Sequence, residues 1–256
     1  MKAVILAAGK GTRMRDLTKL LPKPMLRVQS KPILQHIIEG LKTAGIKDFC
    51  IVTGWQSQSI EDYFGDGSKF GVNIAYAKQE VQNGTGKAAE PAKGFIGSSD
   101  FILTYGDILV YPTTYSEMLK RFDQGQFSGL ITVTAGEDIS KGGLCFFGDD
   151  QCLVSLVEKP SAEQIDQLRQ QGLIRPGQPL WYNAGIYIFK PVLFEFTAKL
   201  SLSPRNEYEL TDAISAMVKC GHKIVGHQIK GRWVDVRDPE TLAKLEAKTE
   251  NLLSDS

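Results

Sequence analysis

Short apolar runs alternate with helical patterns in the first part of the chain. Apolar runs of strand length, bounded by glycine or polar residues, occupy 3–8, 49–53, 72–77 and 101–105. Between them, apolar residues recur at helical spacing over 33–41, with Gly45 where a helix would end, and a second short helix is predicted over 58–64. Strand, helix and strand in this order predict right-handed parallel crossovers. The predicted fold class is therefore α/β, with a doubly wound, mostly parallel mixed sheet.

The second part of the chain changes to local strand pairing. Two apolar runs flank the turn residues Asp149-Asp150, which is typical of a hairpin. These runs predict a small antiparallel addition to the parallel sheet. The predicted elements are a strand at 130–135, the hairpin strands 142–147 and 154–157, a polar helix at 161–171, an alternating strand at 181–189, a helix at 207–217 and an amphipathic helix at 241–253.

Composition and charge exclude several classes of protein. The chain has 256 residues, of which 42% are hydrophobic and 23% charged, as in an ordinary globular protein. With 30 basic and 29 acidic residues the net charge is +1, so we expect no nucleic-acid partner. No apolar run approaches the ~20 residues that cross a bilayer, and we expect no membrane partner. The four cysteines lack metal-like spacing, and the first residues lack an export signal, so reduced thiols and a cytoplasmic location are predicted.

The residues after the first predicted strand have the features of a phosphate-binding loop. They read Gly9-Lys10-Gly11-Thr12-Arg13. Glycine lets backbone amides approach a phosphate closely, Thr12 adds a hydroxyl donor, and the planar Arg13 side chain can grip phosphate oxygens at two points. The loop lacks the third glycine of a dinucleotide-binding fingerprint and the Gly-Lys-Ser/Thr ending of a P-loop. We therefore predict a triphosphate cradle of another design, although glycine-rich turns also occur in proteins that bind other ligands.

A stiff segment with a central lysine follows this loop. Lys23 lies between Pro22 and Pro24, which hold the backbone extended, so it is either a surface lysine in a turn or a lysine presented to a ligand. The two motifs together, Gly-x-Gly-Thr-Arg-Met at 9–14 and Pro-Lys-Pro-Met at 22–25, resemble the signature of the sugar-1-phosphate nucleotidylyltransferases. The resemblance continues through six motifs in family order, from about Lys2 to Pro239. It implies a Rossmann-like nucleotidyltransferase fold.

A polar loop after the third predicted strand contains Gln79 and Gly84-Thr85-Gly86. A glutamine side chain both donates and accepts, as reading a nucleobase edge requires, although a plain polar loop before a helix would have the same composition. The family has its base-reading loop here, in a form that looks most like members that use UTP. The nucleotide-binding residues that the resemblance implies are Leu6, Ala8, Gly9, Gly11, Thr12, Arg13, Gln79, Gly84 and Thr85.

Asp107 directly follows the predicted strand 101–105. It therefore lies at the carboxyl edge of the sheet, where open α/β sheets bind ligands, and a carboxylate suits Mg²⁺, although Gly-Asp is also a common turn. The family has a metal ligand at this position and a second one in the Trp-Val-Asp-Val motif at 233–236. The resemblance thus implies Mg²⁺ as cofactor, with Asp107 and Asp235 as its ligands. The chain departs from the family just afterwards, where Arg-Asp-Pro at 237–239 replaces the usual Gly-Thr-Pro.

The predicted hairpin ends in Glu158-Lys159-Pro160. A carboxylate can accept hydrogen bonds from two neighbouring sugar hydroxyls and a lysine can attract a phosphate, although such a pair is also common on solvated surfaces. The triplet matches the family's sugar-phosphate motif, and Asn183 matches its Asn-x-Gly strand. The sugar-phosphate-binding residues implied are Gly143, Glu158, Lys159 and Asn183. We interpret the segment beginning at Glu207 as mainly structural.

The resemblance implies one nucleotidyltransferase domain over 1–256, with a nucleotide-binding part at about 1–110, a sugar-binding part at about 111–240 and a closing helix at 241–253. The implied partners are a nucleoside triphosphate and a sugar 1-phosphate, and the sequence also allows a homo-oligomer. In the implied reaction the anomeric phosphate oxygen attacks the α-phosphorus in line and pyrophosphate leaves. The catalytic residues implied are Arg13, Lys23, Asp107, Lys159 and Asp235.

Two kinds of alternative remain open at this point. For the substrates, UTP with glucose 1-phosphate is favoured, and GTP with mannose 1-phosphate or dTTP with glucose 1-phosphate are the alternatives. For the class, the chain could be a non-catalytic sugar-nucleotide-binding regulatory subunit. Such a subunit would be expected to have lost a metal aspartate or the pair Arg13 and Lys23, and this chain has all of them.

Overall fold

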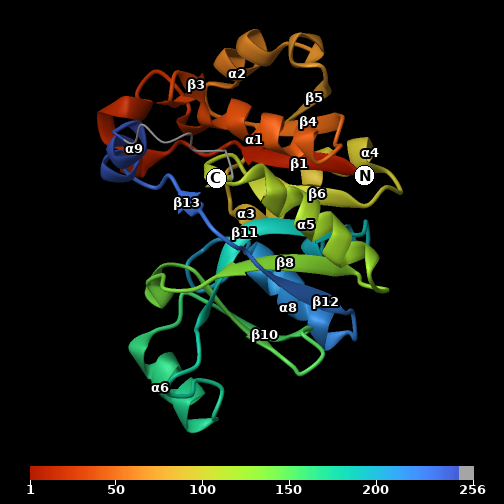
Figure 1. Ribbon diagram of the computed structural model, residues 1–256, viewed down its shortest axis with the longest axis vertical. Helices are drawn as coiled ribbons and strands as arrows, with labels where there is room; N and C mark the ends of the chain where they lie inside the picture. Colours follow the sequence, from red (N-terminus) through yellow and green to blue (C-terminus); the bar gives the residue numbers. More distant parts are fainter. Residues whose placement is uncertain (248–256) are drawn as a thin grey trace.

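The protein has a large mixed sheet covered by helices (Figure 1). The structure is a computed structural model that describes residues 1–247. Its strands are β1 (Lys2–Ala7), β2 (Arg27–Val28), β3 (Lys31–Pro32), β4 (Asp48–Thr53), β5 (Asn73–Lys78), β6 (Phe101–Tyr105), β7 (Ile108–Val110), β8 (Gly129–Thr134), β9 (Gly143–Phe147), β10 (Leu153–Glu158), β11 (Trp181–Phe189), β12 (Ile224–Gln228) and β13 (Trp233–Asp235). Its α-helices are α1 (Ile33–Thr43), α2 (Ser57–Phe64), α3 (Thr85–Ala88), α4 (Lys93–Ile96), α5 (Pro112–Asp123), α6 (Ala162–Gln170), α7 (Leu193–Thr197), α8 (Leu210–Lys219) and α9 (Pro239–Glu246). Short 3₁₀ helices occupy Thr12–Thr18, Lys23–Met25, Ser68–Phe70, Glu90–Ala92 and Ile139–Lys141.

The main sheet joins a parallel half to an antiparallel half. Its strands follow the order β10-β9-β11-β6-β1-β4-β5, and β8 and β12 continue from the other edge of β11. β5, β4, β1 and β6 are parallel, whereas β11 is antiparallel to β6, β8 and β9. The predicted α/β class and the antiparallel addition are both confirmed.

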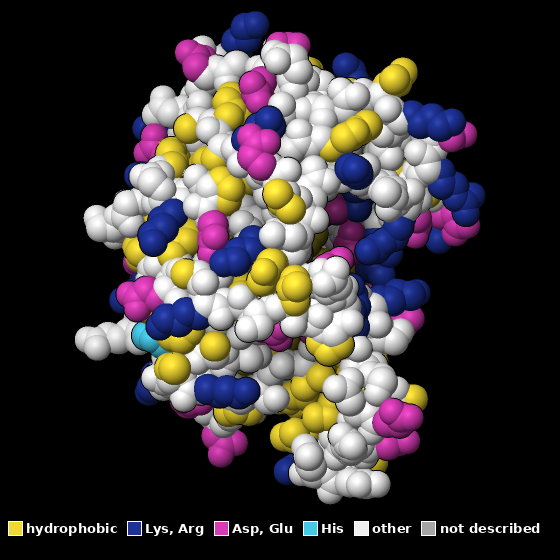
Figure 2. Space-filling view, turned by 180° about the vertical axis from the view of Figure 1, so that it is seen from behind, with side chains coloured by type: hydrophobic (Ala, Val, Ile, Leu, Met, Phe, Trp, Pro, Cys, Tyr) yellow, Lys and Arg dark blue, Asp and Glu magenta, His cyan; other side chains and the backbone are white. Residues whose placement is uncertain are grey.

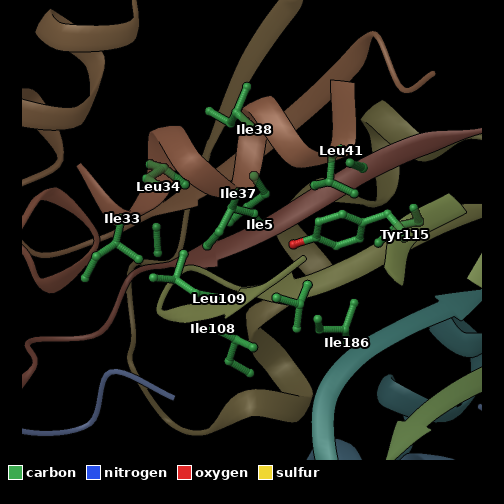
Figure 3. Packing of buried hydrophobic residues seen from close by; sticks show 14 of the residues in the cluster. Ile5, Ile33, Leu34, Ile37, Ile38, Leu41, Ile108, Leu109, Tyr115 and Ile186 are labelled. Carbon is green, nitrogen blue, oxygen red and sulfur yellow. The ribbon is translucent and has the colours of Figure 1, made fainter. Parts of the chain in front are cut away.

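β1 feeds two hydrophobic cores because its side chains alternate between the faces of the sheet. Ala3, Ile5 and Ala7 face one core, and Val4 and Leu6 face the other. On the first face α1 packs an apolar stripe against the sheet, where Figure 3 shows Ile37 beside Ile5 and Leu41 beside Tyr115. The second core includes buried residues of α4, α7 and α8. The sheet is thus covered on both sides, as a doubly wound fold requires.

The sheet divides at the middle of β11. Ile186 to Phe189 pair with β6, whereas Trp181 and Tyr182 pair with β9, and β8 pairs with the opposite edge of β11. β6 and β9 therefore share one edge of β11 and diverge at Gly185, which has φ +78°. A Cβ at Gly185 would lie 2.5 Å from Ile108 Cδ1 and 2.8 Å from Tyr105 Cδ2. Glycine is needed here both for the backbone conformation and for the close approach of β6.

Gly185→Ala is expected to destabilise the protein by more than the cost of placing an alanine in a left-handed backbone conformation. A left-handed conformation costs an alanine about 1–2 kcal/mol, and here the new methyl group would also displace Tyr105 and Ile108. Gly177→Ala is the matched control, because Gly177 has φ +79° and no atom within 4 Å of the added Cβ. Urea unfolding of both variants measures the difference. Equal destabilisation of the two variants would show that close packing at Gly185 is unimportant.

Most sequence-based elements are confirmed, with boundaries that shift by one or two residues. One further difference is that α8 begins at Leu210 rather than at Glu207. The elements that the sequence analysis did not include are β2, β3, α4, β7, α5, α7, β12 and β13. The closing helix is present as α9, and residues 248–253 of that prediction lie outside the described residues. Cys50 and Cys145 are buried free thiols, as predicted.

Candidate active site

The division of the sheet opens into a cavity of about 520 Å³. Figure 2 shows the outline of the molecule indented on one side, with Lys, Arg, Asp and Glu side chains at the indentation. The cavity wall contains every site residue that the sequence analysis named, from both the nucleotide and the sugar groups. These are Leu6, Ala8, Gly9, Gly11, Thr12, Arg13, Lys23, Gln79, Gly84, Thr85, Asp107, Gly143, Glu158, Lys159, Asn183 and Asp235. The structure thus brings together residues that are up to 229 positions apart, from Leu6 to Asp235.

The glycine-rich loop is packed against the segment that carries Lys23. Gly11 has a left-handed conformation and begins the 3₁₀ helix Thr12–Thr18. The Thr18 hydroxyl donates to the Gly11 carbonyl at 3.0 Å, which closes the loop. A Cβ at Gly11 would lie 3.0 Å from Lys23 Cβ. The loop and the lysine are therefore held as one unit at the end of β1.

Two carboxylates converge on Lys23. Asp107 follows β6, and the two-stranded pairing of β7 with β13 places Asp235 opposite Ile108. The Val236 amide also donates to the Asp107 carbonyl at 3.0 Å. Lys23 Nζ lies 2.6 Å from Asp107 Oδ2 and 3.9 Å from Asp235 Oδ1. The cation thus lies between two acidic groups that the backbone holds close to each other.

The surroundings of the Asp235 side chain disfavour its ionised form. Burial, and then the charge of Asp107, raise the pKa of Asp235 to about 6, although Lys23 and Arg237 act in the opposite direction. Two anions this close need a cation, and in this structure the Lys23 ammonium occupies that position.

The same donor set fits Mg²⁺. No group of three or more His, Cys, Asp or Glu residues able to hold a metal occurs in the described part of the chain. Mg²⁺ does not require such a group, since it is commonly held by one or two carboxylates together with substrate phosphates and water. Asp107 and Asp235 offer two hard oxygen-donor groups beside the glycine-rich loop, which meets that requirement.

The loop around Gln79 is fixed by a segment from far along the chain. The Gly86 amide donates to the Tyr208 carbonyl at 2.7 Å, and the Tyr208 amide donates to Asn83 at 2.8 Å. Gly84 has φ +124°, and a Cβ there would lie 2.3 Å from the Tyr208 carbonyl oxygen. The buried Gln79 side chain donates to the Gly84 carbonyl at 3.5 Å. Only glycine permits this contact at position 84.

The segment before α8 contributes to the cavity instead of only supporting the fold. Residues 207–209 are not helical, and Glu207, Glu209 and Thr211 line the cavity. The prediction that a helix begins at Glu207 was wrong, and the segment that was interpreted as mainly structural also lines the cavity. The physical reason is that Tyr208 must stay extended to hold the loop at Gly84 and Gly86.

Glu158 lies at the end of β10, opposite Gly143. Burial raises its pKa, while Lys159 and Arg205 oppose the shift. Arg205 Nη2 lies 3.5 Å from Glu158 Oε1 and 2.6 Å from Glu209 Oε1, so it bridges the half-buried carboxylate of Glu158 and the buried one of Glu209. The sequence analysis did not identify Arg205 or Glu209, and their only local signal is an i,i+4 pair of opposite charge.

Asn183 is oriented by its own strand. Its side-chain amide donates to the Tyr187 hydroxyl at 2.8 Å, and its side-chain oxygen accepts from the Gly185 amide at 3.2 Å. The carboxamide is therefore fixed at the cavity wall where β11 divides.

A family model described as nucleotidyl transferase matches residues 2–251. The chain therefore belongs to the nucleotidyl transferase family. The relatives within that family confirm the resemblance to the sugar-1-phosphate nucleotidyltransferases. No helix within residues 1–247 is long and apolar enough to cross a membrane.

Several curated proteins are similar over nearly the whole chain. The low-salt glycan biosynthesis nucleotidyltransferase Agl11 of Haloferax volcanii is 32% identical, over 94% of this chain and 64% of its own length. The bifunctional protein GlmU of Methanococcus maripaludis is 34% identical, over 99% of this chain and 58% of its own length. A glucose-1-phosphate thymidylyltransferase of Streptomyces griseus is 29% identical, over 92% of this chain and 62% of its own length. The chain thus spans about three fifths of the length of these relatives.

A solved structure supports the same fold. The UDP-glucose pyrophosphorylase complexed with UDP-glucose superposes with a TM-score of 0.81 at 25% identity, covering 96% of each chain.

Proposed function

We propose that this protein transfers a nucleotidyl group from a nucleoside triphosphate to a sugar 1-phosphate, giving a nucleotide sugar and pyrophosphate. The observation that carries this proposal is the convergence of Lys23 with Asp107 and Asp235. They meet in a cavity that has a phosphate-binding loop on one side and the Glu158-Lys159 pair on the other.

In the proposed reaction an anomeric phosphate oxygen attacks the α-phosphorus while the bond to the bridging β-phosphate oxygen breaks. The protein supplies positioning and charge rather than covalent chemistry. Arg13 and the amides of the glycine-rich loop would hold the departing pyrophosphate. Lys23 would stabilise charge on the α-phosphate, and Lys159 would hold the attacking phosphate.

The charge of the cavity supports a divalent cation as cofactor. Its wall carries five basic side chains, Arg13, Lys23, Lys141, Lys159 and Arg237, and five acidic ones, Asp107, Glu158, Glu207, Glu209 and Asp235. This balance leaves no surplus positive charge for two polyanionic substrates. A Mg²⁺ ion held by Asp107 and Asp235 would supply charge neutralisation at the reacting phosphates.

For the substrates we propose UTP and glucose 1-phosphate as the first pair to test. The form of the loop around Gln79 and Gly84-Thr85 supports UTP, as does the similarity to a UDP-glucose pyrophosphorylase. The similarity to a glucose-1-phosphate thymidylyltransferase supports dTTP as the second candidate. GTP with mannose 1-phosphate remains a third.

Pyrophosphate release across a matrix of substrates tests the proposal. The matrix combines UTP, dTTP, GTP, CTP and ATP with the 1-phosphates of glucose, mannose, galactose and N-acetylglucosamine, each with Mg²⁺. One strongly preferred pair is expected. If no combination releases pyrophosphate, and the folded protein still binds a nucleotide sugar, the result would favour a non-catalytic regulatory subunit instead.

Arg205→Met is expected to raise the KM for the sugar 1-phosphate and to move the acid side of the pH profile upward. Burial already raises the pKa of Glu158, and Arg205 opposes that shift together with Lys159, whereas Glu209 reinforces it. Without Arg205 the ionised form of Glu158, which accepts hydrogen bonds from sugar hydroxyls, is lost at a higher pH as the solution is acidified. Steady-state kinetics from pH 5 to 8 measure both effects.

The control for this experiment is Arg169→Met, which removes an exposed arginine on α6 that pairs with Asp166. It should leave both the KM and the pH profile unchanged. An Arg205 variant that behaves like the control would contradict the assigned role of Glu158.

A further inference from the structure

Arg237 forms a chain of charges with two carboxylates. Its Nε lies 3.5 Å from Asp235 Oδ2, and its Nη2 donates to Glu137 Oε2 at 3.3 Å. The Arg237 side chain is 20% exposed and lines the cavity. Glu137 belongs to the loop between β8 and β9, which leads to the cavity wall at Gly143. These contacts therefore connect β13, which carries Asp235, to a loop on the sugar side of the cavity.

The two oxygens of Asp235 face different cations. Oδ1 faces Lys23 at 3.9 Å, and Oδ2 faces Arg237. The backbone around Asp235 is fixed by the pairing of β13 with β7 and by the Val236 amide. Rotation of the side chain is therefore the main freedom left to this carboxylate, and contact with Arg237 at one oxygen restricts it.

We propose that Arg237 is a positioning residue, which holds Asp235 so that Oδ1 faces the cation site, and that Glu137 in turn holds Arg237. This inference rests on the proposed function, in which Asp235 is a metal ligand. Carboxylates that bind metals are commonly held by further hydrogen bonds, and loss of such a partner typically weakens metal binding about 10–100-fold.

Repulsion between the Arg237 guanidinium and the incoming cation opposes the gain from orienting Asp235. Glu137 offsets it, because the Arg237–Glu137 pair has no net charge. Orientation should therefore outweigh repulsion, and removal of Arg237 should weaken cation binding rather than strengthen it. Lysine should not substitute for arginine, because a single ammonium group does not reproduce the fork that contacts both carboxylates.

Binding of Mn²⁺, followed by electron paramagnetic resonance, tests the inference without relying on turnover. Mn²⁺ replaces Mg²⁺ at oxygen-ligand sites. The titration compares the wild type with Arg237→Gln, Arg237→Lys and Glu137→Gln, in the presence of UTP and after circular dichroism shows that each variant is folded. Asp235→Asn identifies the signal of this site, and Arg169→Gln on α6 is the control for loss of one positive charge.

Arg237→Gln is expected to weaken Mn²⁺ binding tenfold or more, Arg237→Lys to restore little, and Glu137→Gln to weaken it by a smaller factor. Arg169→Gln should bind like the wild type. The KM for the sugar 1-phosphate should change less than twofold in the Arg237 variants.

Two results would overturn the inference while leaving the proposed function in place. They are wild-type affinity for Mn²⁺ in Arg237→Gln and tighter binding in that variant. Wild-type affinity together with a raised KM for the sugar 1-phosphate would make Arg237 a substrate contact. If instead Asp235→Asn bound Mn²⁺ as tightly as the wild type, the cation site of the proposed function would itself be refuted.

Discussion

Asp107→Asn is expected to lower kcat by at least about a hundredfold while the protein stays folded. In the proposed reaction this carboxylate helps to place charge at the reacting phosphates, and the loss of one such electrostatic contact typically costs on the order of 10²–10³ in rate. Asparagine has nearly the same shape, and the side chain is 27% exposed, so the core is not disturbed. Pyrophosphate release measures the rate, and circular dichroism with urea unfolding checks the fold.

Lys23→Ala should give a loss of similar size, since it removes the positive charge that stabilises the α-phosphate in the proposed reaction. The control is Asp16→Asn, which changes an exposed aspartate that pairs with Lys19 in the segment after the glycine-rich loop. Near-normal turnover in Asp107→Asn or Lys23→Ala would refute the role assigned to that residue.

Asp235→Asn is expected to abolish most turnover and yet to stabilise the metal-free protein at neutral pH. Burial and the charge of Asp107 raise the pKa of Asp235 from 3.8 to about 6. The folded protein therefore binds this proton more tightly than the unfolded chain does. Its contribution to stability is fully present below about pH 4 and is lost as the pH rises through about 6. This difference in pKa corresponds to about 3 kcal/mol, which the neutral asparagine would retain.

Urea unfolding of the metal-free protein at pH 4 and pH 7 measures this effect. The variant should be more stable than the wild type at pH 7, and the advantage should shrink toward pH 4. Asp149→Asn, in the exposed turn between β9 and β10, is the matched control and should show neither change. A variant that is less stable than the wild type at pH 7 would show that Asp235 is stabilised in its ionised form.

The parallel strands were predictable because burial on both faces leaves an uninterrupted apolar run. The parallel strand β6 has the same bounds in the structure as in the sequence analysis, as does the antiparallel β11. β7 was not predictable in the same way, because three residues are too few to show a period. Yet β7 is what pairs with β13 and brings Asp235 to Asp107. The short strand that brings the two carboxylates together thus has little signal of its own in the sequence.

The site residues were found through motifs, and the residues that were missed lie outside them. The Tyr208 backbone contacts at Gly84 and Gly86 join segments more than 120 positions apart and involve no particular side chain, so no sequence pattern records them. Arg205 and Arg237 could not be assigned a role from the sequence, because the carboxylates that they contact are brought beside them by the fold. The roles assigned to the motif residues themselves, and the division into nucleotide and sugar parts, stay predictions.

Transfer of label from a triphosphate labelled at its α-phosphate tests the central claim most directly. The protein is incubated with Mg²⁺, a sugar 1-phosphate and the labelled triphosphate, and the products are separated. We expect the label in a nucleotide sugar, formed in equal amount with unlabelled pyrophosphate, and almost none with Asp107→Asn. Label that stays in the triphosphate with every substrate pair, or appears equally with Asp107→Asn, would contradict the claim that this cavity catalyses nucleotidyl transfer.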